Sequence, residues 1–237
     1  MSLPSLLILR QEVRELSDPK KAKVLQWFFK TGPGQYGHGD VFLGLTVPVC
    51  RKLAIKFSGL DLVQVKKLLA SKYHEERLIA LLILVHKFDH GSSAEQRRVY
   101  DLYLRSVRYV NNWDLVDLSA DKIVGAYLLQ RPRAVLRKMS ASKDLWQRRI
   151  AIVSTFQFIK HHEFKDTLKL ASILLDDEHD LIHKAVGWML REVGKRNITI
   201  LERWLRRYYH RMPRTMLRYA IERFPESKRL RFLEGKM

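Results

Sequence analysis

The sequence is poor in features that would each define a class of protein. It has one cysteine, Cys50, so no disulfide can form within the chain and we expect a reducing compartment, the cytoplasm. Its apolar runs are all shorter than the roughly 20 residues that span a bilayer. The run from Leu6 to Leu9 is ended by Arg10 and is too short for a signal peptide. We therefore expect no membrane segment and no targeting segment.

Acidic residues are scarce relative to basic ones. The chain of 237 residues has 44 Lys and Arg against 25 Asp and Glu, which gives a formal net charge of +19. Self-repulsion makes such an excess costly. A polyanionic partner explains it, because each cation that meets a phosphate releases condensed counterions. Charge alone leaves ribosome-associated, membrane-surface and heparin-like partners open.

Strand-like alternation is missing as well, and helix signals take its place. Asp18-Pro19 and Thr46-Val47-Pro48 are typical of helix starts, with a capping residue before a proline. Further starts are expected at Ser93, Asn112 and Asp144. Between the starts, apolar residues recur at helical spacing. The sequence therefore predicts an all-α protein.

A weak internal repeat predicts how the helices are arranged. Four similar segments begin at Arg77, Trp113, Arg149 and Lys184, which lie 36, 36 and 35 residues apart. This period is typical of helical-hairpin solenoids, in which each unit buries its face against its neighbours. We expect one domain over residues 1–237 with a concave, basic face.

One position of this repeat carries an unexpected charge. Its fifth column reads Leu81, Asp117, Val153 and Trp188, so a carboxylate stands where the other residues are apolar. Burying a carboxylate there is costly unless it is paired or used. If stacked helices bring equivalent positions together, Trp113, Asp117, Arg149 and Trp188 form one patch.

Such a patch suits the cleavage of an N-glycosidic bond. A carboxylate without a histidine, serine or metal partner is poorly equipped for acyl transfer, but it can stabilise a developing sugar cation. Indole faces favour a nearby cation, and Arg149 could hold a phosphate. The alternatives are a structural Asp117 paired with Arg149, and Trp113 and Trp188 as core aromatics. Asp114 is expected in the first helical turn, where its charge suits the helix dipole.

Three segments resemble the AlkD family of DNA alkylpurine glycosylases, which have a HEAT-like helical-repeat fold. Residues 112–117 (Asn-Trp-Asp-Leu-Val-Asp) are similar to its Trp-Asp-x-Val-Asp segment, and residues 145–149 to its Trp-x-x-Arg segment. Residues 184–192 are similar to its Lys-Ala-x-Gly-Trp-x-Leu-Arg-Glu helix. A weaker fourth match, Phe42-Leu43-Gly44 with Pro48 and Arg51, lies nearer the amino terminus.

This resemblance implies a function for the patch. Asp117 would be the catalytic carboxylate, Trp113 and Trp188 would pack on the sugar, and Arg149 would hold the backbone. The implied substrate is duplex DNA that contains N3- or N7-alkylated purines, and the implied role is to initiate base-excision repair. These cationic bases leave readily, and no lysine stands out as a Schiff-base nucleophile. We therefore expect a monofunctional glycosylase without cofactor or metal, and nothing demands more than a monomer.

Further cations are predicted to contact nucleic acid. Residues 191–237 contain 14 Lys or Arg against 5 Asp or Glu, with aromatic residues interleaved. A solvated basic face is the alternative to a phosphate-contacting one. The predicted contacts are Arg77, Arg148, Arg149, Lys184, Arg206, Arg207, Arg211, Arg214 and Arg218.

The remaining motifs favour structural roles. The Gly32–Asp40 loop lacks a nucleotide P-loop ending and is a surface loop or a backbone phosphate contact. His179 and His183 echo a zinc-binding helix but lack a third ligand downstream. Cys50 is expected to be a small core residue.

Two rival functions stay open. A non-catalytic binder of damaged or branched DNA would bind DNA in a salt-sensitive way and release no base. A protein-interaction scaffold, a frequent use of helical solenoids, would bind DNA negligibly at physiological salt. The net charge of +19 disfavours the scaffold.

Overall fold

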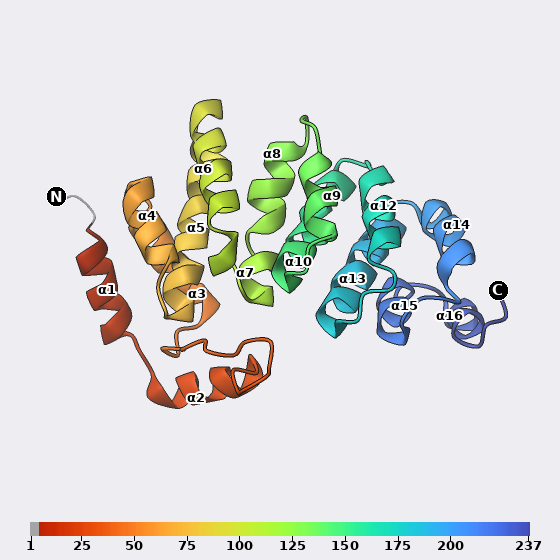
Figure 1. Cartoon of the computed structure of the whole chain (residues 1–237), viewed down its shortest axis with the longest axis horizontal. Helices are drawn as coiled ribbons and strands as arrows, with labels where there is room; N and C mark the ends of the chain where they lie inside the picture. Colours follow the sequence, from red (N-terminus) through yellow and green to blue (C-terminus); the bar gives the residue numbers. More distant parts are fainter. Residues whose placement is uncertain (1–4) are drawn as a thin grey trace. The chain divides into compact units, whose positions relative to one another are not determined.

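The protein is all-α, as predicted (Figure 1). The computed structural model describes residues 5–237, and the strand-like pairing within them is one isolated bridge between Val41 and Tyr73. The helices form two compact units, Met1–Ser119 and Ala120–Met237, here called unit 1 and unit 2. One HEAT-like domain with a concave basic face stays a prediction.

Unit 1 is organised around one long helix, α5. This helix contacts α3, α4, α6 and α7, while α2 lies roughly crosswise to them in Figure 1. The elements of unit 1 are α1 (Leu6–Glu15), α2 (Pro19–Phe28), α3 (Val47–Lys56), α4 (Leu62–Leu69), α5 (His74–His90), α6 (Ser93–Arg105), the 3-10 turn η1 (Val107–Tyr109) and α7 (Trp113–Asp117).

Unit 2 is organised in the same way around α13. This helix contacts α10, α11, α12, α14 and α15. The elements are the π-helical turn η2 (Asp121–Gly125), α8 (Ala126–Leu128), α9 (Ala134–Ser140), α10 (Leu145–Ser154), α11 (Phe156–Lys160), α12 (Lys165–Ile173), α13 (Asp180–Arg196), α14 (Ile198–Tyr208), α15 (Arg214–Ala220) and α16 (Glu226–Leu233).

Most predicted helix starts are confirmed by their caps. The side chains of Asp18 and Asp144 accept backbone N–H groups in the first turns of α2 and α10, and Asn112 precedes α7. One predicted helix start is off by one residue. α6 begins at Ser93, but its cap is Ser92, whose hydroxyl accepts a backbone N–H three residues on. Adjacent serines carry the same capping chemistry, so the sequence alone does not distinguish them.

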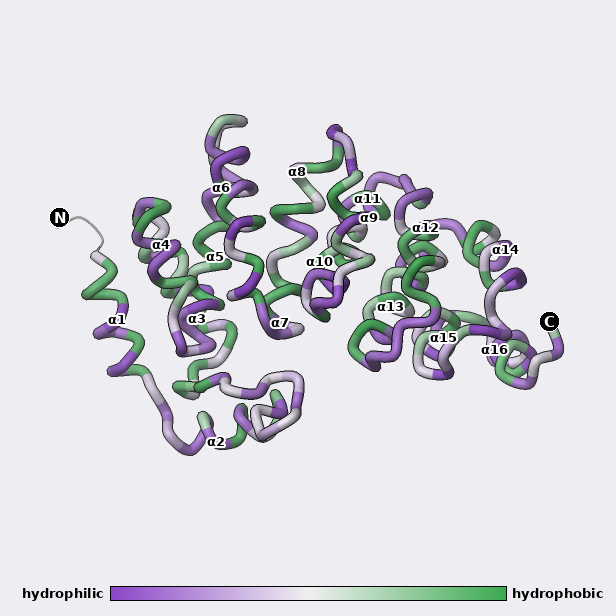
Figure 2. The backbone as a smooth tube through the Cα atoms, viewed as in Figure 1, coloured by the Kyte–Doolittle hydropathy of each residue, from purple (hydrophilic) through white to green (hydrophobic). Residues whose placement is uncertain are grey.

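The central helix of unit 1, α5, differs from the amphipathic helices of the protein. Figure 2 shows hydrophilic and hydrophobic residues alternating along α6 and α12, which each bury one face. In α5, by contrast, every residue from His74 to Leu84 is buried. In α13, Gly187 permits close packing of α15, because a methyl group there would lie 2.6 Å from the carbonyl oxygen of Met216.

Candidate functional site

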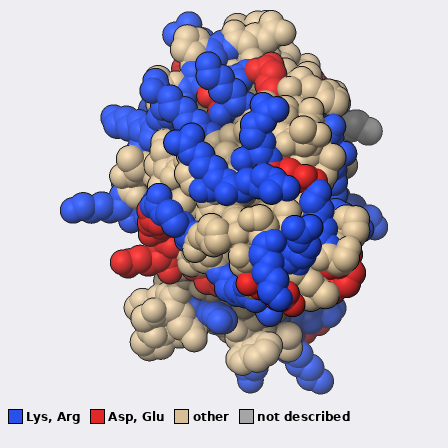
Figure 3. All heavy atoms as spheres, turned by 90° about the vertical axis from the view of Figure 1, so that its right-hand side faces the viewer, with Lys and Arg blue, Asp and Glu red and all other residues tan. Residues whose placement is uncertain are grey.

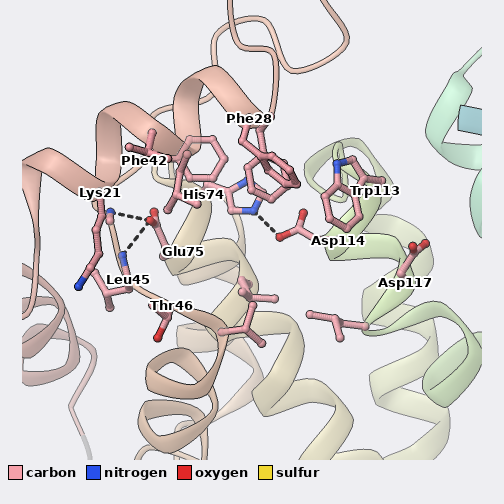
Figure 4. Close-up of a pocket in the computed structure, with 17 residues that line it drawn as sticks. Lys21, Phe28, Phe42, Leu45, Thr46, His74, Glu75, Trp113, Asp114 and Asp117 are labelled. Carbon is pink, nitrogen blue, oxygen red and sulfur yellow. Dashed lines mark hydrogen bonds and ion pairs between the residues drawn. The ribbon is translucent and has the colours of Figure 1, made fainter.

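A pocket of about 560 Å³ opens within unit 1 (Figure 4). Its walls come from α2, α5, α7 and the segment 42–47 that leads into α3. The lining is mostly apolar and aromatic, and the carboxylates that line it belong to Glu75, Asp114 and Asp117. The pocket therefore combines negative charge with a low-polarity wall.

Helix α7 brings two of the predicted catalytic residues to this pocket. Trp113 and Asp117 are one turn apart, so their side chains lie on the same side of the helix. Both are half-buried. The Trp113 ring stacks on Phe29, with 5.1 Å between centroids and 18° between planes, and meets Phe28 edge-on at 6.0 Å. The Asp117 carboxylate thus lies beside an aromatic wall and keeps partial access to solvent.

Behind the pocket, a buried ion network joins three distant parts of the chain. His74, at the start of α5, bonds through Nδ1 to Asp40 Oδ2 at 2.9 Å and through Nε2 to Asp114 Oδ2 at 2.8 Å. Arg77 donates to the other Asp40 oxygen, and Asn112 donates to Asp40 Oδ2 across 3.2 Å. All five side chains belong to buried residues.

The charges of this network balance. Burial alone would lower the pKa of His74, but the carboxylates of Asp114 and Asp40 outweigh it and raise that pKa to about 9. Burial opposes ionisation of Asp40 too, yet its hydrogen bond with His74 and the charge of Arg77 hold its pKa below the ordinary value. At neutral pH an imidazolium and a guanidinium therefore face two carboxylates.

Aromatic rings enclose the imidazolium. The Phe42 ring stacks on His74, with 4.3 Å between centroids and 21° between planes. Phe29 in turn stacks on Phe42 at 4.9 Å and on Trp113 at 5.1 Å. Ring faces attract cations, so the stack favours the protonated state of His74. The network is thereby connected to the aromatic wall of the pocket.

A second buried carboxylate anchors the segment that carries Phe42. Glu75 accepts hydrogen bonds from the backbone N–H groups of residues 43–45, and the shortest, from Gly44, is 2.8 Å. Gly44 has a φ of +90°, and a methyl group there would lie 2.2 Å from the carbonyl oxygen of Asp18. Since Asp18 caps α2, Glu75 fixes the distance between α5 and α2, two walls of the pocket.

The other two predicted catalytic residues belong to unit 2. Arg149 lies on α10, is 5% exposed and donates to the carbonyl oxygen of Leu181. Trp188 lies half-buried on α13, with its ring 5.8 Å from that of Phe156. The joining of Trp113, Asp117, Arg149 and Trp188 into one patch stays a prediction.

Three of the predicted phosphate contacts are Arg77, Arg148 and Lys184, and each of them pairs with a carboxylate. Arg77 is 4% exposed and held by Asp40, which favours a structural role. Arg148 pairs with Asp177 at 2.6 Å, and Lys184 with Asp180 at 2.6 Å.

The five predicted contacts within residues 206–218 are exposed arginines. Figure 3 shows Lys and Arg side chains spread over much of the face on that side of the molecule. Arg211 pairs there with Asp176 at 2.6 Å, and Arg214 donates to the carbonyl oxygen of Leu233. Contact of this face with phosphate stays a prediction, and its members are Arg206, Arg207, Arg211, Arg214 and Arg218.

The remaining motifs have structural partners. His179 caps α13, and His183 bonds to the carbonyl oxygen of Asp177. Within residues 5–237, no three His, Cys, Asp or Glu side chains are arranged as a metal site. Cys50 is fully buried, as predicted, and burial raises the pKa of its thiol. The glycine loop ends at Asp40 in the ion network, and its phosphate contact stays a prediction.

Reasoning from the sequence missed three titratable residues of this site: Asp40, His74 and Glu75. A signal for the last two was present, because residues 74–77 (His-Glu-Glu-Arg) directly precede a wholly apolar stretch of α5. Because this polar run is the first turn of a buried helix, its side chains are buried together with the helix. Asp114 was correctly placed in the first turn of α7, but its bond to His74 was not foreseen.

Comparisons with known proteins identify the family of the chain. The model of one family, described as DNA alkylation repair enzyme, matches residues 9–224. No curated protein matches the chain by sequence. Among the described helices, none combines the length and apolar character that crossing a bilayer requires.

A solved structure shares the fold. It is described as a predicted DNA alkylation repair enzyme from Enterococcus faecalis, with a TM-score of 0.69 and 16% identity over 89% of this chain and 97% of that one. At that identity the structure supports the fold alone. The family match spans most of the sequence and includes every residue of the pocket. The chain belongs to the DNA alkylation repair enzyme family.

Proposed function

We propose that the protein is a monofunctional DNA glycosylase that hydrolyses the N-glycosidic bond of cationic N3- or N7-alkylated purines in duplex DNA. The observation that carries the proposal is the position of Asp117, a partly accessible carboxylate next to Trp113 at the edge of an apolar pocket. Membership of a DNA alkylation repair family supports the choice of substrate.

The chemistry needs little more than a well-placed negative charge. An alkylated purine is already cationic and leaves as a neutral base, so no general acid has to protonate it. As the bond breaks, positive charge moves to the sugar, and a nearby carboxylate stabilises it. Asp117 would do this electrostatically and would orient the attacking water.

The apolar surroundings strengthen this effect. Charges interact more strongly where water is excluded and the dielectric is low. The wall formed by Phe28, Phe29 and Trp113 lowers the polarity beside Asp117. The Trp113 ring would also favour a cationic sugar by about 0.5–2 kcal/mol.

The two carboxylates of α7 would have different roles, a structural one for Asp114 and a catalytic one for Asp117. Asp114 is bound to an imidazolium and is 6% exposed, so its charge is already neutralised. Asp117 is more accessible, which suits contact with a substrate. Trp188 and Arg149 of unit 2 would pack on the sugar and hold the backbone phosphate.

The test is base release from a duplex that carries a single 7-methylguanine. We expect free 7-methylguanine and an apurinic site from the wild-type protein, and at least a 100-fold slower release, about 2.7 kcal/mol, from Asp117→Asn. A matched control is Asp89→Asn, an exposed carboxylate at the end of α5 outside the pocket. Tight DNA binding without base release by the wild-type protein would instead identify a non-catalytic binder.

A further inference from the structure

Helix α2 exposes large apolar side chains to solvent. Trp27 is 82% exposed, Val24 64% and Phe28 53%. Scattered exposed apolar residues are ordinary, but three within two turns of one helix, including a tryptophan, form a patch typical of a binding surface. A tryptophan of this kind is among the residues that dominate binding energy once it is covered.

The patch is continuous with the pocket that contains Asp117. Val24 and Phe28 line that pocket, and Phe28 lies 6.0 Å from Trp113. Trp27 lines an adjoining hollow at the end of α2, together with Phe28. Figure 4 shows Phe28 beside the Trp113 ring, in the pocket that Asp114 and Asp117 also line. A ligand held at Asp117 would therefore extend naturally over α2.

Positive charge surrounds the patch. Lys20, Lys23 and Lys30 are exposed, and no carboxylate of the described chain lies within ion-pair distance of them. Unpaired lysines beside exposed aromatic rings fit a ligand that has both phosphates and flat apolar faces. Aromatic side chains stack on unpaired bases in single-stranded nucleic acid, and apolar side chains enter between base steps of bent duplexes.

We propose that Trp27 and Phe28 lie against nucleobases next to the damaged nucleotide, and that they unstack the duplex there while the lysines of α2 hold flanking phosphates. This inference rests on the proposed function in that DNA occupies the Asp117 pocket. In this arrangement the exposed patch on α2 distorts the substrate, whereas the carboxylate of Asp117 acts on the sugar.

The probe is a duplex with a tetrahydrofuran abasic-site analogue next to 2-aminopurine, whose fluorescence rises when it unstacks. The analogue has no base and hence no N-glycosidic bond at the lesion position, so the signal is independent of catalysis. We expect the fluorescence to rise with the wild-type protein and to rise equally with Asp117→Asn. With Trp27→Ala we expect the rise to be lost and affinity to fall about 5- to 100-fold.

Three variants separate stacking from other effects. Trp27→Phe keeps a ring and should keep most of the signal. Lys23→Ala should lower the salt dependence of binding by about one counterion but leave the signal at saturation unchanged. Ile55→Ala removes another exposed apolar side chain (64%) from α3, outside the pocket, and should change neither quantity.

Acrylamide quenching gives a second readout. The difference between the wild-type protein and Trp27→Phe isolates the fluorescence of Trp27, and bound duplex should shield it. Full quenching of Trp27 at saturating DNA would overturn the proposal. So would shielding without any change in 2-aminopurine, since this would mean contact with the backbone only. If the signals depend on Trp27 but no alkylated base is released, the proposed glycosylase function fails and this inference stands.

Discussion

The imidazole Nε2 of His74 lies 2.8 Å from Oδ2 of Asp114, and this contact joins the start of α5 to the first turn of α7. The same first turn holds Trp113, and Asp117 follows one turn later. Because Asp40 holds the other ring nitrogen at 2.9 Å, the imidazole is fixed on both sides. The position of Asp117 thus depends on His74, which is 1% exposed and acts through Asp114.

His74→Gln should make stability depend less on pH. A raised pKa means that the contribution of His74 is fully present below about pH 6.5 and is lost as the pH rises through about 9. The difference in free energy of unfolding between the wild-type protein and the variant should therefore be of the order of 3 kcal/mol at pH 6 and shrink steadily towards pH 9. Urea unfolding across this range measures it, and a constant difference would contradict the assignment of an imidazolium.

Asp114→Asn should destabilise the protein and lower the pKa of His74. The amide cannot balance the buried imidazolium, and removal of one partner from a buried ion pair costs about 3–5 kcal/mol. The carbon-bound protons of the His74 ring report its titration by NMR, and their midpoint should move down from about 9. An unshifted midpoint would mean that Asp114 does not set the charge state of His74.

Gly44→Ala should cost far more stability than Gly39→Ala. Both glycines have positive φ, +90° and +85°, so each substitution carries the strain of a left-handed residue, about 1–2 kcal/mol. Only at Gly44 would the new methyl group also collide with the backbone, at Asp18, while nothing lies within 4 Å of the position at Gly39. Thermal unfolding of both variants tests this, and equal losses would show that the α2–α5 spacing tolerates change.

Arg206→Ala and Arg218→Ala should each weaken DNA binding at low salt. If each arginine meets a phosphate, its loss lowers the slope of log affinity against log salt by about one, uniformly across sequences. A suitable control is Arg97→Ala on α6 of unit 1, an exposed arginine beside Asp101. Unchanged slopes for the first two variants would place the DNA elsewhere on the protein.

Local features of the fold were readable from the sequence because their causes are local. Asp18, Asn112 and Asp144 cap helices through hydrogen bonds to residues at most three positions away. Helical periodicity correctly indicated the all-α class, and Cys50 was correctly placed in the core. Such features need no knowledge of which helices meet.

The ion network was not readable for the opposite reason. Asp40 and Asp114 lie 34 and 40 residues from His74, and no periodic pattern connects a loop residue, a helix start and a first-turn acid. A histidine in a core helix is equally consistent with a neutral side chain whose hydrogen bonds are satisfied. The exposure of Trp27 was not readable either, since a tryptophan directly before two phenylalanines is ordinarily expected to be buried.

The single-turnover rate of base release, with a 7-methylguanine duplex fully bound, tests the central claim most directly. With Asp117→Asn we predict a rate constant lower by about two orders of magnitude or more, while DNA affinity stays within about threefold of the wild-type value. A variant that binds the duplex and releases 7-methylguanine as fast as the wild-type protein would contradict the account.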